Sequence, residues 1–223
     1  MNAVYIVDAI RTPVGKAPRG VFKNTLPDDL LVHTLNSIIQ RNPSVDWGTL
    51  GDIVIGCAMP EAEQGMNVAR IASLLANLPQ SVPAMTINRF CSSGVQSIAT
   101  AAANIELGHM DLALAGGVES MSMVPLGGNN YTVNPKIFDN EHIGIAYGMG
   151  ITAELVAKQW GITKEAQDEF AADSHKKAVQ AQLNGDFKAE ITPIEVTLRQ
   201  FEANQLTVTE SKHLVSQDEG PRA

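Results

Sequence analysis

Residues 84–98 read AMTINRFCSSGVQSI, and this stretch decides both the fold and the place of the chemistry. Its first residues form an apolar run that predicts a short strand, and its later residues have the small and apolar side chains of a helix. Cys91 stands at the junction. A helix N-terminus presents free backbone N–H groups and a positive dipole end, which stabilise a thiolate relative to a thiol. A sharp strand-to-helix turn also exposes its apical side chain, so the sequence predicts Cys91 as a nucleophile for acyl transfer.

The segments on either side alternate between strands and helices. Apolar runs predict strands over residues 4–9, 52–56, 85–88 and 112–115, the first of them buried. Helical spacing of apolar residues predicts helices over 27–41, 67–76 and 92–107. Such alternation indicates βαβ units, so we expect an α/β fold with a mixed, mainly parallel sheet covered by helices.

The helix expected over 92–107 has no polar face. Val95, Ile98 and Ile105 recur at helical spacing, and alanines occupy much of the remaining surface. A helix that is apolar all round is usually buried all round. We therefore expect this helix to lie in a middle layer of the fold.

The second half of the chain begins with an irregular segment over 118–150 and continues with helices. The first helix is expected over 152–160, and the next begins after the N-cap Thr163 and ends near Gly185. Residues 191–196 are typical of a strand, and the remainder of the chain is polar.

Composition narrows the class of protein. The chain has 223 residues, of which 44% are hydrophobic and 18% charged, and a formal net charge of −8, so it can bury a core and has no basic surface for nucleic acid or anionic lipid. Two cysteines make no disulfide framework, and Cys57 is expected to fill space at a strand end. There is no basic, apolar leader, no run of eighteen apolar residues and no metal-ligand spacing. We expect a soluble cytoplasmic protein that binds neither nucleic acid nor membrane and holds no metal.

Five motifs occur in the order that one family uses. They are RTPVG at 11–15, NRFCSSG at 88–94, GGVESMS at 116–122, MGITAE at 149–154 and DEGPR at 218–222. On these residues the chain resembles the N-terminal half of the thiolases, the family of acetyl-CoA acetyltransferases and 3-ketoacyl-CoA thiolases. The resemblance covers essentially the whole chain.

The resemblance implies a particular architecture. Residues 1–117 would form an α/β half-domain, and residues 118–223 would belong to a loop domain that covers coenzyme A. Two such half-domains stack into five layers, αβαβα, in this family, with the helix after Cys91 in the centre. The C-terminal half-domain is absent from residues 1–223. Family members are homodimers or homotetramers, so the resemblance implies the same here.

The resemblance also implies roles for individual residues. Cys91 matches the cysteine that carries the acyl group, Met149 matches a residue of the acyl and pantetheine channel, and Arg222 matches a residue at the nucleotide end of coenzyme A. Coenzyme A and its acyl thioesters would be substrates, with no permanently bound cofactor. Gly148 stands where biosynthetic thiolases usually have histidine, which favours the degradative 3-ketoacyl-CoA type of fatty acid metabolism.

Three motifs of the family's C-terminal half do not occur in this sequence: Gly-His-Pro with its acid/base histidine, Cys-x-Gly, and Asn-Glu-Ala. The five histidines, which we assign to the surface or to packing, lie in none of these contexts. A missing general base typically costs about 10²–10⁴-fold in rate. We therefore expect residues 1–223 to be catalytically incomplete without the second half-domain.

Two other functions remain open at this point. One is a ketosynthase-like condensing enzyme on the same architecture, against which the GGVESMS motif weighs. The other is a non-catalytic acyl-CoA-binding or assembly module, which would bind coenzyme A and leave Cys91 unreactive.

Overall fold

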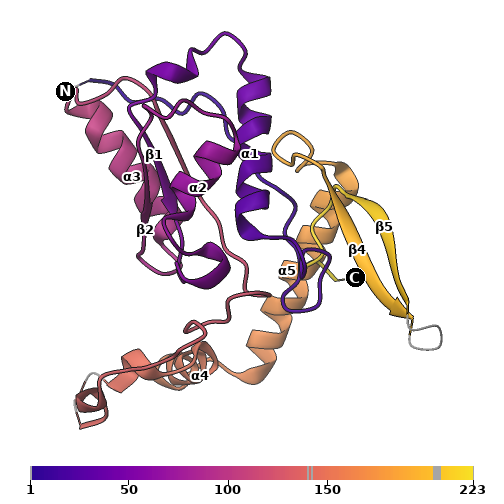
Figure 1. The fold of residues 1–223 in the computed structure, drawn as a ribbon. Coiled ribbons are helices and arrows are strands. Elements are labelled where there is room, and N and C mark those ends of the chain that lie inside the picture. Colours follow the sequence, from indigo (N-terminus) through magenta and orange to yellow (C-terminus); the bar gives the residue numbers. More distant parts are fainter. Residues whose placement is uncertain (1, 140, 142, 203–206, 223) are drawn as a thin grey trace. The chain divides into compact units, whose positions relative to one another are not determined.

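The computed structural model describes residues 2–139, 141, 143–202 and 207–222 (Figure 1). The chain falls into two units. The first comprises Met1–Asn129 and Phe187–Gly220, and the second comprises Asn130–Asp186 and Pro221–Ala223. These units are defined by spatial contacts; the division into a half-domain over 1–117 and a loop domain over 118–223 stays a prediction.

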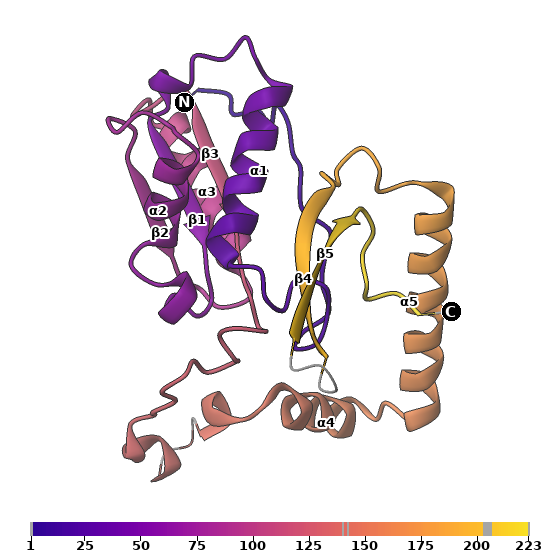
Figure 2. The ribbon, with the colours of Figure 1, turned by 45° about the vertical axis from the view of Figure 1, so that its right-hand side comes forward.

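A parallel sheet organises the first unit. Its strand order is β2-β1-β3, with β1 at Asp52–Gly56 in the middle, β2 at Ala84–Ile87 and β3 at Ala113–Gly117 (Figure 2). Both pairs are parallel. These strands fall within a residue or two of those that the sequence predicts, and the expected α/β class is confirmed.

Helices cover both faces of this sheet. Ile53 and Ile55 point to one face, where they pack in one cluster with residues of α1 (Pro27–Arg41) and α2 (Val68–Leu75). Because side chains alternate along a strand, Gly56 belongs to the other face. There it meets the first turn of α3, at Ser93–Glu106. Two short 3₁₀ helices, Trp47–Thr49 and Ala62–Gln64, complete this part of the unit.

An antiparallel hairpin also belongs to the first unit. It consists of β4 at Ile194–Glu202 and β5 at Thr207–Val215, and Ile194, Val196 and Val215 form a small core with Phe22. The sequence predicts a strand over 191–196, which β4 overlaps, and a polar remainder; the strand β5 lies in that polar remainder and is not predicted. The middle of TVTESKHLV is a run of five polar residues, 209–213, which hides the alternation of a half-buried strand but suits a two-stranded ribbon with much of its surface in water.

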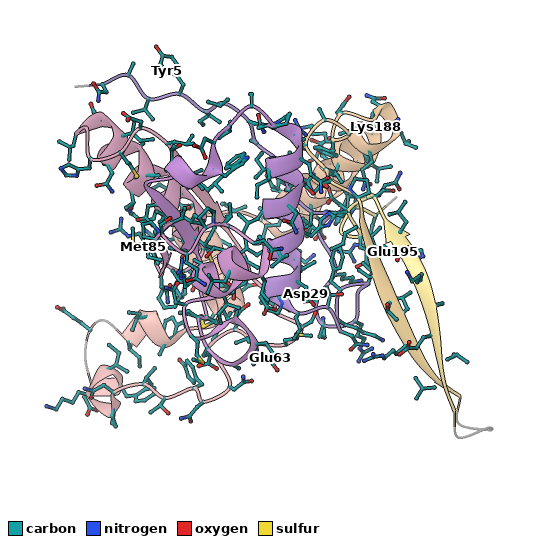
Figure 3. The ribbon with its side chains drawn as sticks, turned by 45° about the horizontal axis from the view of Figure 1, so that its top comes forward. Tyr5, Asp29, Glu63, Met85, Lys188 and Glu195 are labelled. Carbon is teal, nitrogen blue, oxygen red and sulfur yellow. The ribbon has the colours of Figure 1, made fainter. Side chains whose placement is uncertain are left out.

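Two expectations about burial are wrong. Residues 4–9 form no strand; Tyr5, Ile6 and Val7 are each at least 78% exposed, and Figure 3 shows Tyr5 pointing away from an extended segment. A strand needs a hydrogen-bonded neighbour, and the described residues supply none for this segment. Within residues 1–223, α3 buries only the side that faces the sheet, and Val95 on its other side is 73% exposed, so this helix is not buried all round here; its place in a middle layer between two half-domains stays a prediction.

The second unit is helical. It contains the 3₁₀ helices Pro135–Asp139 and Ile143–Ala146, α4 at Met149–Trp160 and α5 at Lys164–Asn184. The hydroxyl of Thr163 accepts a hydrogen bond from the N–H of Ala166 (3.2 Å), and Gly185 ends α5 at φ 78°, which confirms both predicted caps. Among the described residues, no helix combines the length and the apolar character needed to cross a membrane.

Candidate active site

Cys91 lies between β2 and α3, two residues before the helix begins, and it is exposed. The strand ends at Ile87, so only five residues separate strand from helix. The structure therefore has the sharp strand-to-helix turn that the sequence predicts, with the cysteine within it.

The turn contains a strained residue that side chains hold in place. Phe90 has φ 46°, in the left-handed region, which costs a non-glycine residue about 1–2 kcal/mol. Its N–H donates to Oδ1 of Asn88 (2.8 Å). The buried hydroxyl of Ser93 accepts from the N–H of Arg89 (2.8 Å) and donates to the carbonyl of Phe90 (2.6 Å). These three hydrogen bonds fix the backbone on which Cys91 stands.

The helix end behind Cys91 is fixed by close contact with the sheet. A Cβ on Gly56 would lie 2.4 Å from the carbonyl carbon of Ser93 and 2.7 Å from the nitrogen of Gly94, so the first turn of α3 packs directly on the backbone of β1. One turn later, the hydroxyl of the buried Ser97 donates to the carbonyl of Gly116 in β3 (2.7 Å). The ends of two strands thus position the N-terminus of α3.

A buried polar cluster lies at the same end of the sheet. Gln64 is fully buried; its Nε2 donates to the carbonyl of Met59 (2.9 Å) and to Oε1 of Glu119, and its Oε1 accepts from the N–H of Ser120 (2.9 Å). The other carboxylate oxygen of Glu119 accepts from the N–H of Ala58 (2.6 Å). Sequence reasoning gave these residues no role. Glu119 stands in a quoted motif, but Gln64 lies in no recognisable pattern.

The two cysteines have opposite surroundings. Cys57 is buried, and burial, followed by the nearby charge of Glu119, raises the pKa of its thiol to about 12. Cys57 therefore stays protonated at neutral pH and is a poor nucleophile, as expected of a cysteine that fills space. Cys91 is the exposed thiol.

Met149 and Arg222 belong to the second unit, whereas Cys91 belongs to the first. Met149 is the first residue of α4 and is 63% exposed. Arg222 lies beside α5, where its N–H donates to Nδ1 of His175 (3.2 Å) and its Nη2 lies 3.4 Å from Nε2 of the same ring. The roles of Met149 and Arg222 toward coenzyme A stay predictions.

Two other kinds of site were considered. An open hollow lies between the end of α4 and the start of α5, lined in part by Lys158, Thr163 and Lys164, and none of the three predicted site residues lines it. Across the described part of the chain, no three His, Cys, Asp or Glu side chains gather closely enough to hold a metal ion. Cys91 and its turn are thus the site with the clearest chemistry.

Comparisons with known proteins agree with the motifs. A model of the family described as "Thiolase, N-terminal domain" matches residues 4–223. A 3-ketoacyl-CoA thiolase of Bacillus subtilis is 46% identical over 223 residues, which is 100% of this chain and 56% of that protein. A 3-ketoacyl-CoA thiolase of Erwinia tasmaniensis is 43% identical, over 92% of this chain and 54% of that protein. The chain thus spans about half the length of these relatives.

A solved structure has the same fold. The crystal structure of the Bacillus anthracis acetyl-CoA acetyltransferase superposes with a TM-score of 0.77 at 32% sequence identity, over 96% of this chain and 54% of that one. The likeness therefore extends over nearly all of residues 1–223.

Proposed function

This chain belongs to the thiolase family, and from that premise we propose that the protein transfers acyl groups between coenzyme A thioesters through an acyl-enzyme on Cys91. The observation that carries the proposal is the exposed thiol of Cys91, held in a braced turn directly before α3. A thiolate in that place is a strong nucleophile, and the thioester that it forms stays activated for a second transfer.

In the proposed reaction, the thiolate of Cys91 attacks the keto carbon of a 3-ketoacyl-CoA. The bond between C2 and C3 then breaks, the shortened acyl group remains on Sγ, and the released carbanion takes up a proton to become acetyl-CoA. The thiol of a second coenzyme A loses its proton and attacks the acyl-enzyme, which frees Cys91 and a shorter acyl-CoA. Read backwards, the same steps are a Claisen condensation of acetyl-CoA.

The start of α3 supports the first step electrostatically. A tetrahedral intermediate carries a negative oxygen, and backbone N–H groups that point at such an oxygen stabilise it. We assign this role to the N–H of Cys91, at the positive end of the helix dipole. Both proton transfers need an acid/base group, and residues 1–223 lack the Gly-His-Pro motif that supplies it in the family. The second half-domain is therefore part of the proposed active site.

We further propose that the substrate is a 3-ketoacyl-CoA cleaved in fatty acid metabolism. Gly148, in place of the histidine that biosynthetic thiolases usually carry, supports this direction, as do the names of the similar Bacillus and Erwinia proteins. Met149 would line the acyl and pantetheine channel and Arg222 would contact the nucleotide end of coenzyme A, both from a loop domain over 118–223 attached to a half-domain over 1–117. The working form would be a cytoplasmic homodimer or homotetramer; two unpaired cysteines suit a reducing compartment.

The test is to trap the acyl-enzyme. The complete protein is incubated with a 3-ketoacyl-CoA, with and without coenzyme A, and Cys91 is examined by mass spectrometry for the acyl group. We expect an adduct on Cys91, no turnover by Cys91→Ala, and a retained adduct on Cys91 in the matched variant Cys57→Ala. An unmodified Cys91 together with full turnover by Cys91→Ala would refute the proposal.

For residues 1–223 on their own, a second function is an acyl-CoA-binding module without turnover. The observation that favours it is the lack of the family's acid/base motifs in this sequence. Iodoacetamide labelling near neutral pH separates the two functions, because an activated Cys91 reacts much faster than free cysteine and a merely binding module does not.

A further inference from the structure

We propose that Glu119 and Gln64 are positioning residues that hold the Cys91 turn in its reactive shape, acting through Ala58 and Asn88. The inference rests on the proposed function, because only a reactive Cys91 requires that the conformation of its turn be fixed. Neither residue touches Cys91, so their effect must pass through the contacts that join them to the turn.

The first link is the segment that follows β1. The N–H of Ala58 donates to Oε2 of Glu119 (2.6 Å), while its carbonyl accepts from Nδ2 of Asn88 (3.0 Å). Ala58 therefore has a carboxylate on its amide side and a carboxamide on its carbonyl side. A shift of Ala58 away from Glu119 moves the acceptor that Asn88 uses.

The second link is the side chain of Asn88. Because its Nδ2 is committed to Ala58, its Oδ1 faces the N–H of Phe90 at 2.8 Å. Phe90 is the strained residue directly before Cys91, at φ 46°. An Asn88 that loses Ala58 is free to rotate, and the left-handed turn then loses one of its three ties. The position of Cys91 relative to the start of α3 depends on that turn.

The third link fixes Glu119 itself. Its two oxygens accept from two separate donors, Nε2 of Gln64 and the N–H of Ala58. Gln64 is fully buried and is held in turn by Met59 and Ser120. Only an acceptor-only group satisfies donors on both sides, so glutamine at position 119 would turn an NH₂ group toward one of them.

A neighbouring carboxylate provides the matched control. Glu61 also accepts from a backbone N–H, that of Asn129, and it stands three residues from Gln64. Glu61→Gln removes the same charge, but the amide oxygen of glutamine can still accept from the N–H of Asn129, and this contact leads to residue 129 rather than to the turn. A general effect of charge or of loop stability would therefore appear in both variants.

The experiment compares Cys91 in the complete protein and in Glu119→Gln, Glu119→Asp and Glu61→Gln. Two quantities are measured in the folded fraction: the rate constant for alkylation of Cys91 by iodoacetamide, and kcat and KM for cleavage of a 3-ketoacyl-CoA. A displacement of about 1 Å at a reacting group costs up to about 100-fold. We expect Glu119→Gln to lower the alkylation rate and kcat by about 10-fold to 100-fold with KM little changed. Glu119→Asp, which keeps two acceptors, should recover part of the loss, and Glu61→Gln should match the wild type.

A second variant interrupts the path at its other end, in case Glu119→Gln does not fold. Asn88→Asp keeps the acceptor for Phe90 and loses the donor to Ala58; it is measured at high salt so that the added charge is screened. It should reproduce the loss, and the double variant Asn88→Asp/Glu119→Gln should lose little more than the worse single variant, because both break one path.

The outcomes separate this inference from the proposed function. If wild-type Cys91 forms the acyl adduct but Glu119→Gln and Asn88→Asp react at the wild-type rate, the positioning role is wrong and the proposed function stands. Equal losses in Glu119→Gln and Glu61→Gln also refute it, as do fully additive losses in the double variant. If wild-type Cys91 forms no adduct, the proposed function fails first.

Discussion

The Cys91 turn and the α4–α5 region are built in opposite ways. Around Cys91, buried side chains such as Ser93 and Ser97 tie a few residues to the sheet. Neither α4 nor α5, both fully described, has a buried residue. These helices are stabilised by interactions between residues close in sequence, such as the N-cap hydrogen bond of Thr163 and the exposed salt bridge between Asp173 and Lys177. Local interactions of this kind contribute little each, typically less than about 1 kcal/mol.

This difference indicates which part of the proposed site is structurally fixed within residues 1–223: the Cys91 turn rather than the residues expected to contact coenzyme A. The turn that carries Cys91, the proposed nucleophile, is held by hydrogen bonds within the first unit. Of the residues expected to meet coenzyme A, Met149 stands on a helix without a buried residue and Arg222 lies beside another such helix, so we expect their arrangement to depend more on what they bind. Changes near Cys91 should therefore alter both stability and reactivity, and a change at Met149 on α4 should alter substrate affinity with little effect on stability.

Among the variants of the Cys91 region, Gly56→Ala should have the largest effect on stability and on Cys91 reactivity. The new Cβ would meet the backbone of Ser93 at 2.4 Å, and backbone atoms cannot rotate away as a side chain can. We expect a destabilisation of about 3 kcal/mol and a loss of most Cys91 alkylation, because the start of α3 must move. Denaturant unfolding and iodoacetamide labelling measure both effects. Gly94→Ala is the control, since a Cβ there meets nothing within 4 Å; equal damage from both would mean that close packing at Gly56 is not the cause.

Ser93→Ala should have a smaller effect on the same two quantities, stability and Cys91 reactivity. The variant removes two hydrogen bonds and leaves the N–H of Arg89 and the carbonyl of Phe90 without this partner, at a cost of about 1–3 kcal/mol. The strain of Phe90 is then less opposed, so Cys91 alkylation should also slow. Ser92→Ala is the matched control, because Ser92 is the N-cap residue but its side chain makes no capping hydrogen bond. If Ser92→Ala slows alkylation as much as Ser93→Ala does, the hydroxyl of Ser93 does not hold the turn.

The sequence predicts the elements of this site better than the contacts between them. The pattern predicts β1, α1 and α3 almost to the residue, because β1 contains a continuous apolar run buried on both faces, whereas α1 and α3 carry apolar residues at helical spacing. In α2 the spacing predicts one apolar side made of Val68, Ile71, Leu74 and Leu75. Val68 is buried, but Leu74 and Leu75 are exposed, and the buried side includes Ala69 and Ala72 instead. In a short helix of mostly apolar residues, packing against β1 and β2 decides which side is covered, and spacing alone does not reveal it.

Other features depend on residues far apart in the chain. Gln64 and Glu119 are separated by 55 positions, and no local pattern links them. Residues 4–9 have the composition of a strand, but a ladder also needs a partner, and composition does not say whether one is near. The junction predicts Cys91 as a nucleophile and the family motif implies that it carries the acyl group; the structure confirms its place in the turn, and its role stays a prediction.

A moderate effect is expected where the first unit ties residues 11–14 to residue 218. Arg11 forms two hydrogen bonds with the carboxylate of Asp218 (2.7 and 3.0 Å), and the N–H of Val14 donates to it as well (2.8 Å). Burial raises the pKa of Asp218, but the bonds from Arg11 and Val14 outweigh it, so the net pKa is lowered. Asp218 thus stabilises the fold at pH values above about 4, and the stabilisation disappears as the pH falls through its folded pKa.

Asp218→Asn should therefore destabilise the protein by about 1–2 kcal/mol at neutral pH, and the difference from the wild type should shrink in acid. Unfolding by denaturant across that pH range measures it. Asp173→Asn in α5 is the comparison: the pKa of Asp173 is lowered mainly by its hydrogen bond with Lys177, yet that pair is exposed to solvent and should leave stability unchanged. If the unfolding free energies of Asp218→Asn and the wild type differed by the same amount at all pH values, the titration of Asp218 would not be coupled to folding.

The smallest structural effect, and the sharpest test of the contrast, is expected from Met149→Ala. Met149 is 63% exposed at the start of α4, so removing its side chain should barely change the unfolding free energy or the rate at which iodoacetamide labels Cys91. If Met149 lines the acyl and pantetheine channel, KM for a 3-ketoacyl-CoA should rise by about 10-fold, the usual scale for a lost apolar contact in a pocket. Ile151→Ala on the same helix, where the side chain is 54% exposed, serves as the control and should leave KM unchanged. A Met149→Ala variant that alters Cys91 labelling but not KM would show that α4 supports the nucleophile rather than the substrate, and the contrast between the two regions would fail.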